Sequence, residues 1–519
     1  MKFCRSARFR VLLLGAAVLT AAAWLRGAEY DEQYTLFLTA GWARPDWPET
    51  VFPAGLIAAA QAGHAGFAGI ARDLRATDVH PPLYFWAVSV WREAFGPGLF
   101  AARLFSVLCG VVSLGLIGRI ARQCGIRPAA AMLATLGCYG FVYTNAVARG
   151  FAPADMLTLT GVTLLLGRRP VPAGAMLGAA CGCNYLAVFV AAAAVASARA
   201  WKALPAAVPF LALDAWFFAA QHGSRPDQFA PFALGPGLLR LAAYQVAAVF
   251  GGLPLYVDGW LRVAVGAAVG FAGAGLLVVV VLSRPWASGS GVRLVLAAAG
   301  APPAGLLLLG AVFDNTPIEL RYLSFGLPFV GLLVAFGWHG RRAARSLPPS
   351  WPGWSGSPVA SGACIVGPDK PGHDEEGTTP GPGSFPVPAC LAVTLLLAIQ
   401  TASIAGLLLS PRTQQPARAA AAEAAGLAGG GIVLLPRGND GVGIPGAFGI
   451  EAPPALPLLL VRPGDPVAER IVSWRRVVVV TRAQDRDSAA TLPLLRAALG
   501  PPNWRRVAIG SNVEVYQRE

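Results

Sequence analysis

The sequence predicts an all-α bundle of membrane-spanning helices followed by a small C-terminal α/β domain. Of its 519 residues, 55% are hydrophobic and only 13% are charged, whereas soluble proteins carry about 25% charged residues. The hydrophobic residues gather in runs of roughly 16 to 25, the length that a helix needs to cross a hydrocarbon core about 30 Å thick. From Ser410 onward, short β-like runs alternate with Ala-rich helical stretches instead.

The positive charge is distributed as a topology signal. The net charge is +14, but the arginines lie singly or in pairs at the ends of apolar runs and form no basic stripe interleaved with aromatic residues. This distribution argues against a nucleic-acid partner. None of the eight cysteines has the paired spacing of zinc ligands, and we expect Cys181 and Cys183 to pack between helices.

The first apolar run follows Lys2, Arg5, Arg8 and Arg10, so the positive-inside rule places the N-terminus in the cytoplasm. We expect this helix to stay uncleaved, with removal as a signal peptide as the alternative. Counting onward gives about eleven spans. Their approximate ranges are 9–25, 99–117, 129–143, 154–166, two within 173–198 broken near Asn184, then 204–220, 263–282, 294–313, 322–338 and 390–409.

Several segments between the spans differ in character. Residues 26–98 are polar enough for a long external loop with helices near 30–42 and 54–71. The run 81–95 is aromatic, about 15 residues long and interrupted by two charges, so we predict an interfacial helix; the alternative is a further span. We expect the amphipathic run 238–250 to lie on the membrane as well.

The sequence thus divides into four parts. A catalytic transmembrane bundle covers 1–345, a Pro/Gly-rich disordered cytoplasmic loop covers 346–388, a last transmembrane helix covers 389–410 and a periplasmic α/β domain covers 411–519. Within 346–388, the stretch 367–377 resembles translated interspersed repeat elements of alphaproteobacterial genomes. We interpret its cluster 373–376 as an inserted passenger, with a metal site as the alternative.

The tail has the pattern of a small α/β domain. We expect strands at 431–435, 458–461, 477–481 and 507–516, and helices at 417–427 and 489–499. It contains no phosphate loop, nucleophile elbow or metal-spaced cluster, so structure or contact with an acceptor is its expected role.

With this topology, the ionisable residues of the bundle gather on one outer face. Asp31 and Glu32 follow the first span, and Arg149 and Arg321 lie at the outer ends of later spans. Asp31 and Glu32 are adjacent, so they project in different directions from a helix and only one of them can face a given cavity. The alternative is that they simply form a polar cap on a membrane helix.

Several short motifs surround these residues, and their combination is more specific than any one of them. They are Asp31-Glu32, the run His80-Pro81-Pro82-Leu83-Tyr84, Phe95-Gly96, Ala102-Arg103-Leu104, Ala148-Arg149-Gly150-Phe151 and Arg321-Tyr322-Leu323. This series resembles the GT-C superfamily of polyprenyl-phosphate-dependent glycosyltransferases. It is most similar to the branch of protein O-mannosyltransferases and lipid A aminoarabinose transferases. Phe151, where a Tyr is usual, and Asn145, where a Gln or Glu is common, depart from the pattern at positions that bear on donor or acceptor specificity.

The resemblance implies a bacterial inner-membrane hexosyl- or pentosyltransferase. Transfer from a lipid phosphate needs a base for the acceptor hydroxyl and cations for the phosphate that leaves. Asp31 is the implied base. Glu32 is the alternative base, or a residue that positions Asp31 or a divalent metal. His80, Arg149 and Arg321 are the implied phosphate ligands.

The partners implied are a polyprenyl-phosphate-sugar donor, membrane lipids, and an acceptor that is a glycolipid, a polysaccharide or a protein. Non-catalytic roles are the alternative for Arg149, Arg321 and His80, because interfacial arginines also bind lipid head groups and His80 precedes a helix start. Two other functions remain open: a lipid or glycolipid transporter, or a non-catalytic scaffold. A transporter would carry ionisable residues near the midplane, and Asp214 is the best candidate for one, although it has no evident partner in the sequence.

Overall fold

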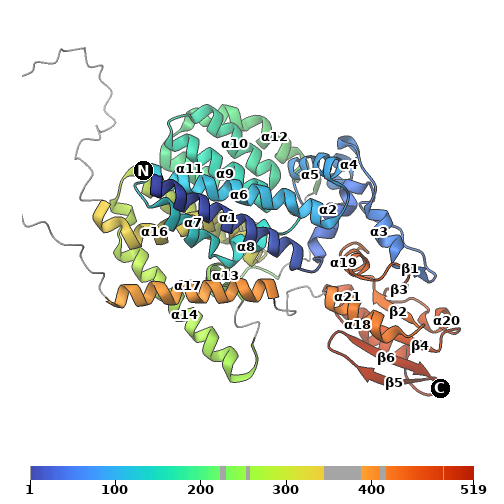
Figure 1. Cartoon of the computed structure of the whole chain (residues 1–519). Coiled ribbons are helices and arrows are strands. Elements are labelled where there is room, and N and C mark those ends of the chain that lie inside the picture. The colour runs from blue at the N-terminus through green and yellow to red at the C-terminus, as the bar shows by residue number, and fades with distance from the viewer. Residues whose placement is uncertain (1, 222–229, 253–256, 344–386, 410–416, 483) are drawn as a thin grey trace, which may run out of the picture.

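The structure, a computed structural model, describes residues 2–221, 230–252, 257–343, 387–409, 417–482 and 484–519. A helical bundle and a smaller C-terminal domain built on a six-stranded sheet confirm the predicted fold class (Figure 1). The loop predicted at 346–388, including the passenger cluster 373–376, lies outside the described residues except for its last two positions.

The bundle is built from twelve of the described helices and one 3-10 segment. They are α1 (Lys2–Leu25), α6 (Leu99–Gln123), α7 (Pro128–Leu136), α8 (Tyr139–Asn145), α9 (Phe151–Leu166), α10 (Pro170–Cys183), α11 (Ala187–Ala198), α12 (Leu204–Gln221), α13 (Leu234–Phe250), α14 (Gly259–Leu282), α15 (Ser290–Phe313), η4 (Leu320–Gly326), and α16 (Leu327–Ala343), with α17 (Val387–Leu409) lying alongside. Six described segments are long and apolar enough to cross a membrane by length and composition. The protein is a multi-pass membrane protein, and the count of eleven spans stays a prediction.

Two of the apolar runs are each divided into two helices. The run 173–198 breaks at Asn184 as predicted, because Asn184 is extended (φ −159°, ψ 121°) between α10 and α11. The run 129–143 was expected to be one helix but divides into α7 and α8 at Gly137 and Cys138. At Gly137 the side chain of Gln400 from α17 approaches so closely that a Cβ would collide with it.

The segment between α1 and α6 forms a cluster of short helices at one end of the bundle (Figure 1). These are α2 (Tyr30–Ala40), α3 (Gly55–Gln61), α4 (Phe67–Thr77) and α5 (Leu83–Phe95). The helix expected at 54–71 is thus two helices. The 13 residues of α5 reach about 20 Å at 1.5 Å per residue, and its place at the membrane interface stays a prediction.

The buried side chain of Arg92 links the helices of this cluster by hydrogen bonds. It is 4% exposed, and its guanidinium donates to the carbonyl of Leu36 at 3.1 Å and to that of Gln61 at 2.6 Å. The charge that interrupts the apolar pattern of α5 is therefore a link between α2, α3 and α5.

The C-terminal domain is a sheet in the order β1-β3-β2-β4-β6-β5 with helices on both faces. Its elements are α18 (Ala417–Ala428), β2 (Ile432–Pro436), α19 (Gly443–Glu451), β3 (Pro457–Val461), α20 (Val467–Arg470), β4 (Arg476–Val480), α21 (Arg486–Ala498), β5 (Trp504–Ile509) and β6 (Val513–Arg518). Strands β2, β3 and β4 are parallel, whereas β6 pairs antiparallel with both β4 and β5. The run expected at 507–516 thus covers the end of β5, the turn and most of β6.

The remaining strand, β1 (Phe52–Pro53), comes from the loop between α2 and α3 and pairs antiparallel with β3. The sheet is therefore shared between the tail and the N-terminal helical cluster. Alternation along the strands gives the sheet two apolar faces. Val433, Leu435 and Leu460 belong to a core continuous with the bundle, and Ile432 and Leu434 belong to a separate core on the other face.

Glycines on α19 allow it to pack tightly against the N-terminal cluster. A Cβ at Gly443 would collide with the ring of Tyr30, and one at Gly449 would lie 2.6 Å from the side chain of Ile57. Helix α2 is consequently held between the bundle and the C-terminal domain (Figure 1).

Candidate active site

Four of the five predicted site residues meet at this end of the bundle. Asp31 lies in the first turn of α2, and its carboxylate pairs with the guanidinium of Arg321 from η4. Arg149, which precedes α9, donates from Nη1 to the backbone carbonyl of Asp31 at 3.1 Å. The side chains of Asp31 and Arg321 are 19% and 24% exposed, so the pair is partly open to a ligand.

His80 reaches the same place through Arg149. The Nη2 atom of Arg149 lies 2.9 Å from Nε2 of His80, and Nδ1 of His80 lies 2.8 Å from Oδ1 of Asp78. A guanidinium can only donate, so Nε2 accepts and the ring proton is on Nδ1, directed at Asp78. In this arrangement a neutral His80 orients Arg149, and Arg149 and Arg321 are the two cations at the site.

Glu32 points away from Asp31 into the protein, as expected for neighbours on a helix. It is fully buried, and its carboxylate accepts four hydrogen bonds. Two come from Arg103 at 2.8 and 2.6 Å, one from the backbone N–H of Ala148 at 2.7 Å and one from that of Glu29 at 3.0 Å. These bonds satisfy the carboxylate and fix the residue before Arg149.

Arg103 uses all five of its N–H donors at this junction. Besides its two bonds to Glu32, it donates to the backbone carbonyls of Ala23 (2.9 Å), Arg26 (2.8 Å) and Gly27 (2.8 Å). These carbonyls belong to the end of α1 and the turn after it, where a helix leaves its last C=O groups without partners. The pair of Arg103 and Glu32 therefore sets the angle between α1 and α2.

A second buried carboxylate, Glu29, lies in the same turn. It forms an ion pair with Arg26 and accepts a hydrogen bond from the hydroxyl of Tyr143 at 2.8 Å. Burial alone would raise the pKa of Glu29, but the charge and hydrogen bond of Arg26 and the hydrogen bond of Tyr143 hold that pKa below its ordinary value. Glu29 is thus an ionised structural group.

The two acidic residues considered for a divalent metal both have protein partners. Glu32 is occupied by its four donors, and Asp31 is paired with Arg321. Across the part of the chain that the structure describes, no group of three or more His, Cys, Asp or Glu side chains is arranged to hold a metal ion.

Two residues of the site received no role from the sequence. Asp78 is 1% exposed and is hydrogen-bonded to His80. The sequence feature that could have identified it is its position two residues before the histidine. Arg103 stands in an otherwise apolar stretch of α6, and a charge in a membrane helix needs a partner. Asp155, 1% exposed in α9, carries the same signal and was also missed.

The departures from the family pattern have local packing roles. Phe151 lies with its ring centroid 6.4 Å from that of Tyr322 and 6.0 Å from that of Phe325, so it supports the η4 segment next to Arg321. Asn145 is fully buried and donates to the carbonyl of Phe141 at 2.8 Å.

Helix α2 is also fixed from the C-terminal domain. The hydroxyl of Tyr34 donates to Oδ2 of Asp440 at 2.6 Å, and the hydroxyl of Tyr30 lies 3.3 Å from Oδ2 of Asp485. Arg44 pairs with the same Asp440. Residues one position before and three positions after Asp31 therefore contact loops at the carboxyl ends of β2 and β4.

No protein-family model matches this chain, and no curated protein matches it. Its structure is similar to crystal structures of ArnT from Cupriavidus metallidurans, one bound to undecaprenyl phosphate and one in the apo state, each at 12% sequence identity and a TM-score of 0.49, with 98% of this chain and 97% of that chain covered. It is also similar to a cryo-EM structure of the arabinofuranosyltransferase AftD from mycobacteria, at 15% identity and a TM-score of 0.39, with 99% of this chain and 41% of that chain covered.

Proposed function

We propose that the protein is a membrane glycosyltransferase of the GT-C superfamily that moves a sugar from a polyprenyl-phosphate donor to an acceptor hydroxyl. The observation that carries this proposal is the meeting of one carboxylate, Asp31, with two guanidiniums, Arg149 and Arg321, from three distant segments. A base next to two phosphate-binding cations is the set of groups that such a transfer needs.

Asp31 is the proposed general base. Its carboxylate accepts the proton of the acceptor hydroxyl while the acceptor oxygen attacks the anomeric carbon. The bond from that carbon to the phosphate oxygen breaks, and the electron pair leaves with the lipid phosphate. Attack from the side opposite the phosphate inverts the anomeric carbon.

Arg149 and Arg321 are the proposed ligands of the phosphate. A guanidinium presents paired N–H groups that match phosphate oxygens, and charge-assisted bonds of this kind are among the strongest in proteins. Arg321 is paired with Asp31. A lipid phosphate that takes over Arg321 would release the carboxylate of Asp31, so binding of the donor would itself free the base.

We propose a positioning role for Glu32 and for His80. Glu32 is bonded to Arg103 and to the N–H of Ala148, so it places both α2 and the residue before Arg149. His80 accepts from Arg149 and orients its guanidinium. Neither proposal involves a metal.

The positive-inside rule supports the outer face of a bacterial inner membrane as the location of this site, with the N-terminus in the cytoplasm and the C-terminal domain in the periplasm. The donor sugar is a hexose or a pentose. The acceptor is a glycolipid, a polysaccharide or a protein side chain, because loops rather than the shared site build the acceptor surface.

The proposal is tested with radiolabelled polyprenyl-phosphate sugars and membranes that contain the protein, with extracts of cell envelope as acceptors. Loss of label from at least one donor, dependent on both the protein and the acceptor, is expected. Transfer of the labelled lipid between leaflets without loss of its sugar would contradict the proposal and favour the transporter. No change in any donor would favour the scaffold.

Replacing Arg149 by Gln is expected to raise the KM for the lipid donor by about 10- to 100-fold, because a charge-assisted phosphate contact contributes roughly 1.5 to 3 kcal/mol. Arg149→Lys should recover only part of this loss, since lysine lacks the planar fork. Arg293→Gln is the matched control, an exposed arginine at the opposite end of α15 from η4. An unchanged donor KM in Arg149→Gln would remove this residue from the phosphate site.

A further inference from the structure

One carboxylate of the C-terminal domain, Asp440, is the starting point of two lines of contact to the candidate site. It lies in the loop between β2 and α19, and its side chain is 13% exposed. Its Oδ1 atom accepts from the backbone N–H of Val442 at 3.0 Å, so the loop itself fixes the carboxylate. Its Oδ2 atom accepts from the hydroxyl of Tyr34 at 2.6 Å and pairs with the guanidinium of Arg44. Asp440 is thus an acceptor shared by two residues of the N-terminal segment.

The first line runs along α2 to the proposed base. Successive residues of a helix point about 100° apart, so Asp31 projects between the direction of Tyr34 and that of Thr35. Tyr34 faces the C-terminal domain through its bond to Asp440, whereas Thr35 faces the bundle and donates to the carbonyl of Ala148 at 2.8 Å. The two bonds therefore fix the rotation of α2 on either side of Asp31.

The bond from Tyr34 to Asp440 has the length of a charge-assisted one. A hydroxyl that donates to an ionised carboxylate lies about 2.5 to 2.7 Å from it, and this distance is 2.6 Å. The hydroxyl of Tyr34 also lies 3.1 Å from that of Tyr30, whose oxygen lies 3.3 Å from Oδ2 of Asp485. Asp440 makes the shortest of these contacts, so we assign the hold on α2 to it rather than to Asp485.

The second line runs through Arg44 to the support of a cation. Nη2 of Arg44 donates to the carbonyl of Thr77 at 2.8 Å, while Nη1 of the same guanidinium pairs with Asp440. Thr77 is the last residue of α4, and the turn after it carries His80, which accepts from Arg149. Asp440 therefore also fixes the start of the turn that orients Arg149. Because the side chain of Arg44 is 37% exposed, this line is the weaker of the two.

We propose that Asp440 is a positioning residue for sugar transfer and that it acts on two parts of the site separately. Through Tyr34 it keeps the carboxylate of Asp31 where that group takes up the acceptor proton. Through Arg44 it keeps Arg149 where that guanidinium binds the donor phosphate. This inference rests on the proposed transfer reaction, and it makes the C-terminal domain part of the catalytic unit.

The two lines can be separated kinetically, because they lead to groups with different tasks. Tyr34→Phe removes one hydroxyl and should lower kcat about tenfold with the donor KM unchanged, since a displacement of 1 Å can cost about 100-fold and Glu32 still holds α2 from the bundle. Arg44→Gln should raise the donor KM about threefold, the size of one partly exposed ion pair, with kcat unchanged. Asp440→Ala should show both effects.

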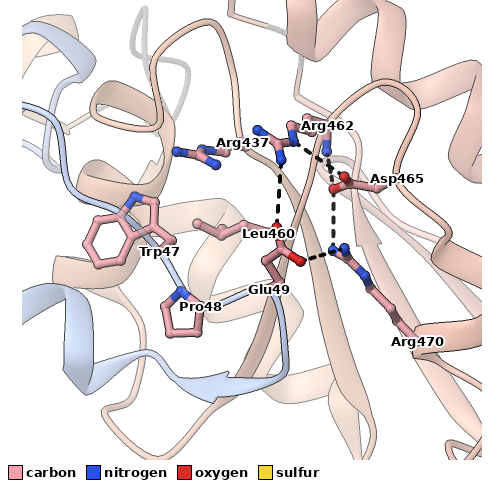
Figure 2. Close-up of a pocket in the computed structure, with 8 residues that line it drawn as sticks. All are labelled: Trp47, Pro48, Glu49, Arg437, Leu460, Arg462, Asp465 and Arg470. Carbon is pink, nitrogen blue, oxygen red and sulfur yellow. Dashed lines mark hydrogen bonds and ion pairs between the residues drawn. The ribbon is translucent and has the colours of Figure 1, made fainter.

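Asp465 offers a matched control in the same domain. Its side chain is 12% exposed, its Oδ2 atom accepts from the backbone N–H of Arg462 at 3.1 Å, and its carboxylate pairs with Arg462 and Arg470 (Figure 2). Both arginines belong to the C-terminal domain itself. Asp465→Ala therefore removes a carboxylate of the same exposure and bonding as Asp440, and it should leave kcat and the donor KM as in the wild type.

The experiment measures initial rates of label release from the lipid donor by the purified full chain in detergent, normalised to the monodisperse fraction. Tyr34→Phe combined with Asp440→Ala should have the same kcat as Asp440→Ala, because both changes remove the same bond. If Asp440→Ala does not accumulate, Tyr34→Phe alone decides, since it removes no charge.

Three results would overturn the inference while the transfer reaction stands. They are a wild-type kcat in Tyr34→Phe, an equal loss of activity in Asp465→Ala, and additive losses of kcat in the double variant. A wild type that releases no sugar from any donor would instead overturn the proposed function, and this inference with it.

Discussion

Asp31→Asn is expected to abolish sugar transfer in a protein that still folds. Asparagine keeps the size of the side chain and the backbone carbonyl that accepts from Arg149, but it cannot take up the proton of an acceptor hydroxyl. Loss of a general base lowers kcat by roughly 10²- to 10⁴-fold. The measurement is the rate of release of labelled sugar from the lipid donor at saturating donor and acceptor.

The donor KM distinguishes this role from a structural one. Asp31→Asn also releases Arg321 from its ion pair, so the KM for the donor should stay the same or fall while kcat collapses. Asp46→Asn, an exposed change in the same segment, should behave as the wild type. A variant Asp31→Asn with near-normal kcat would eliminate Asp31 as the base.

Glu32→Ala is expected to destabilise the whole bundle. It would leave Arg103 buried at 2% exposure without its carboxylate and remove the acceptors of two backbone N–H groups. Removing one partner of a buried ion pair costs about 3 to 5 kcal/mol, a large share of the stability of most proteins. The measurement is the fraction of monodisperse protein that survives heating in detergent.

A double variant keeps this prediction decisive if Glu32→Ala does not accumulate. Arg103→Met combined with Glu32→Leu removes both charges, so it should be more stable than either single change even though the backbone N–H groups of Ala148 and Glu29 stay unpaired. Glu93→Gln, with a side chain 67% exposed, should change the melting temperature very little. Equal losses in the single and double variants would mean that the ion pair is not what Glu32 contributes.

The sequence predicts the class of this site better than its internal roles. Apolar runs and short motifs are local signals, and they were enough to select Asp31, His80, Arg149 and Arg321, which the structure brings together. Which of Asp31 and Glu32 is the base and which is structural depends on which one binds Arg103, and Arg103 lies 71 positions after Glu32 in the chain. Such a contact leaves no trace in the local pattern.

Helix α19 shows where local propensity misleads. Its sequence Gly443-Ile-Pro-Gly-Ala-Phe-Gly contains residues that favour turns, and no helix was predicted there. The helix forms because its glycines allow contact with the ring of Tyr30 and the side chain of Ile57. Tertiary packing thus outweighs a cost of about 1 kcal/mol for each glycine relative to alanine.

Strand β1 affects whether the C-terminal domain can be expressed as a separate fragment. It contributes only Phe52 and Pro53, which pair with Leu458 and Pro457 at the start of β3, and residues 458–461 of β3 are all apolar and buried. A sheet whose apolar border strand is uncovered tends to recruit another chain. Residues 417–519 expressed alone would therefore lack the edge strand β1. A soluble fragment of this domain, or a chimera with a related enzyme, would have to include the segment that contains Phe52.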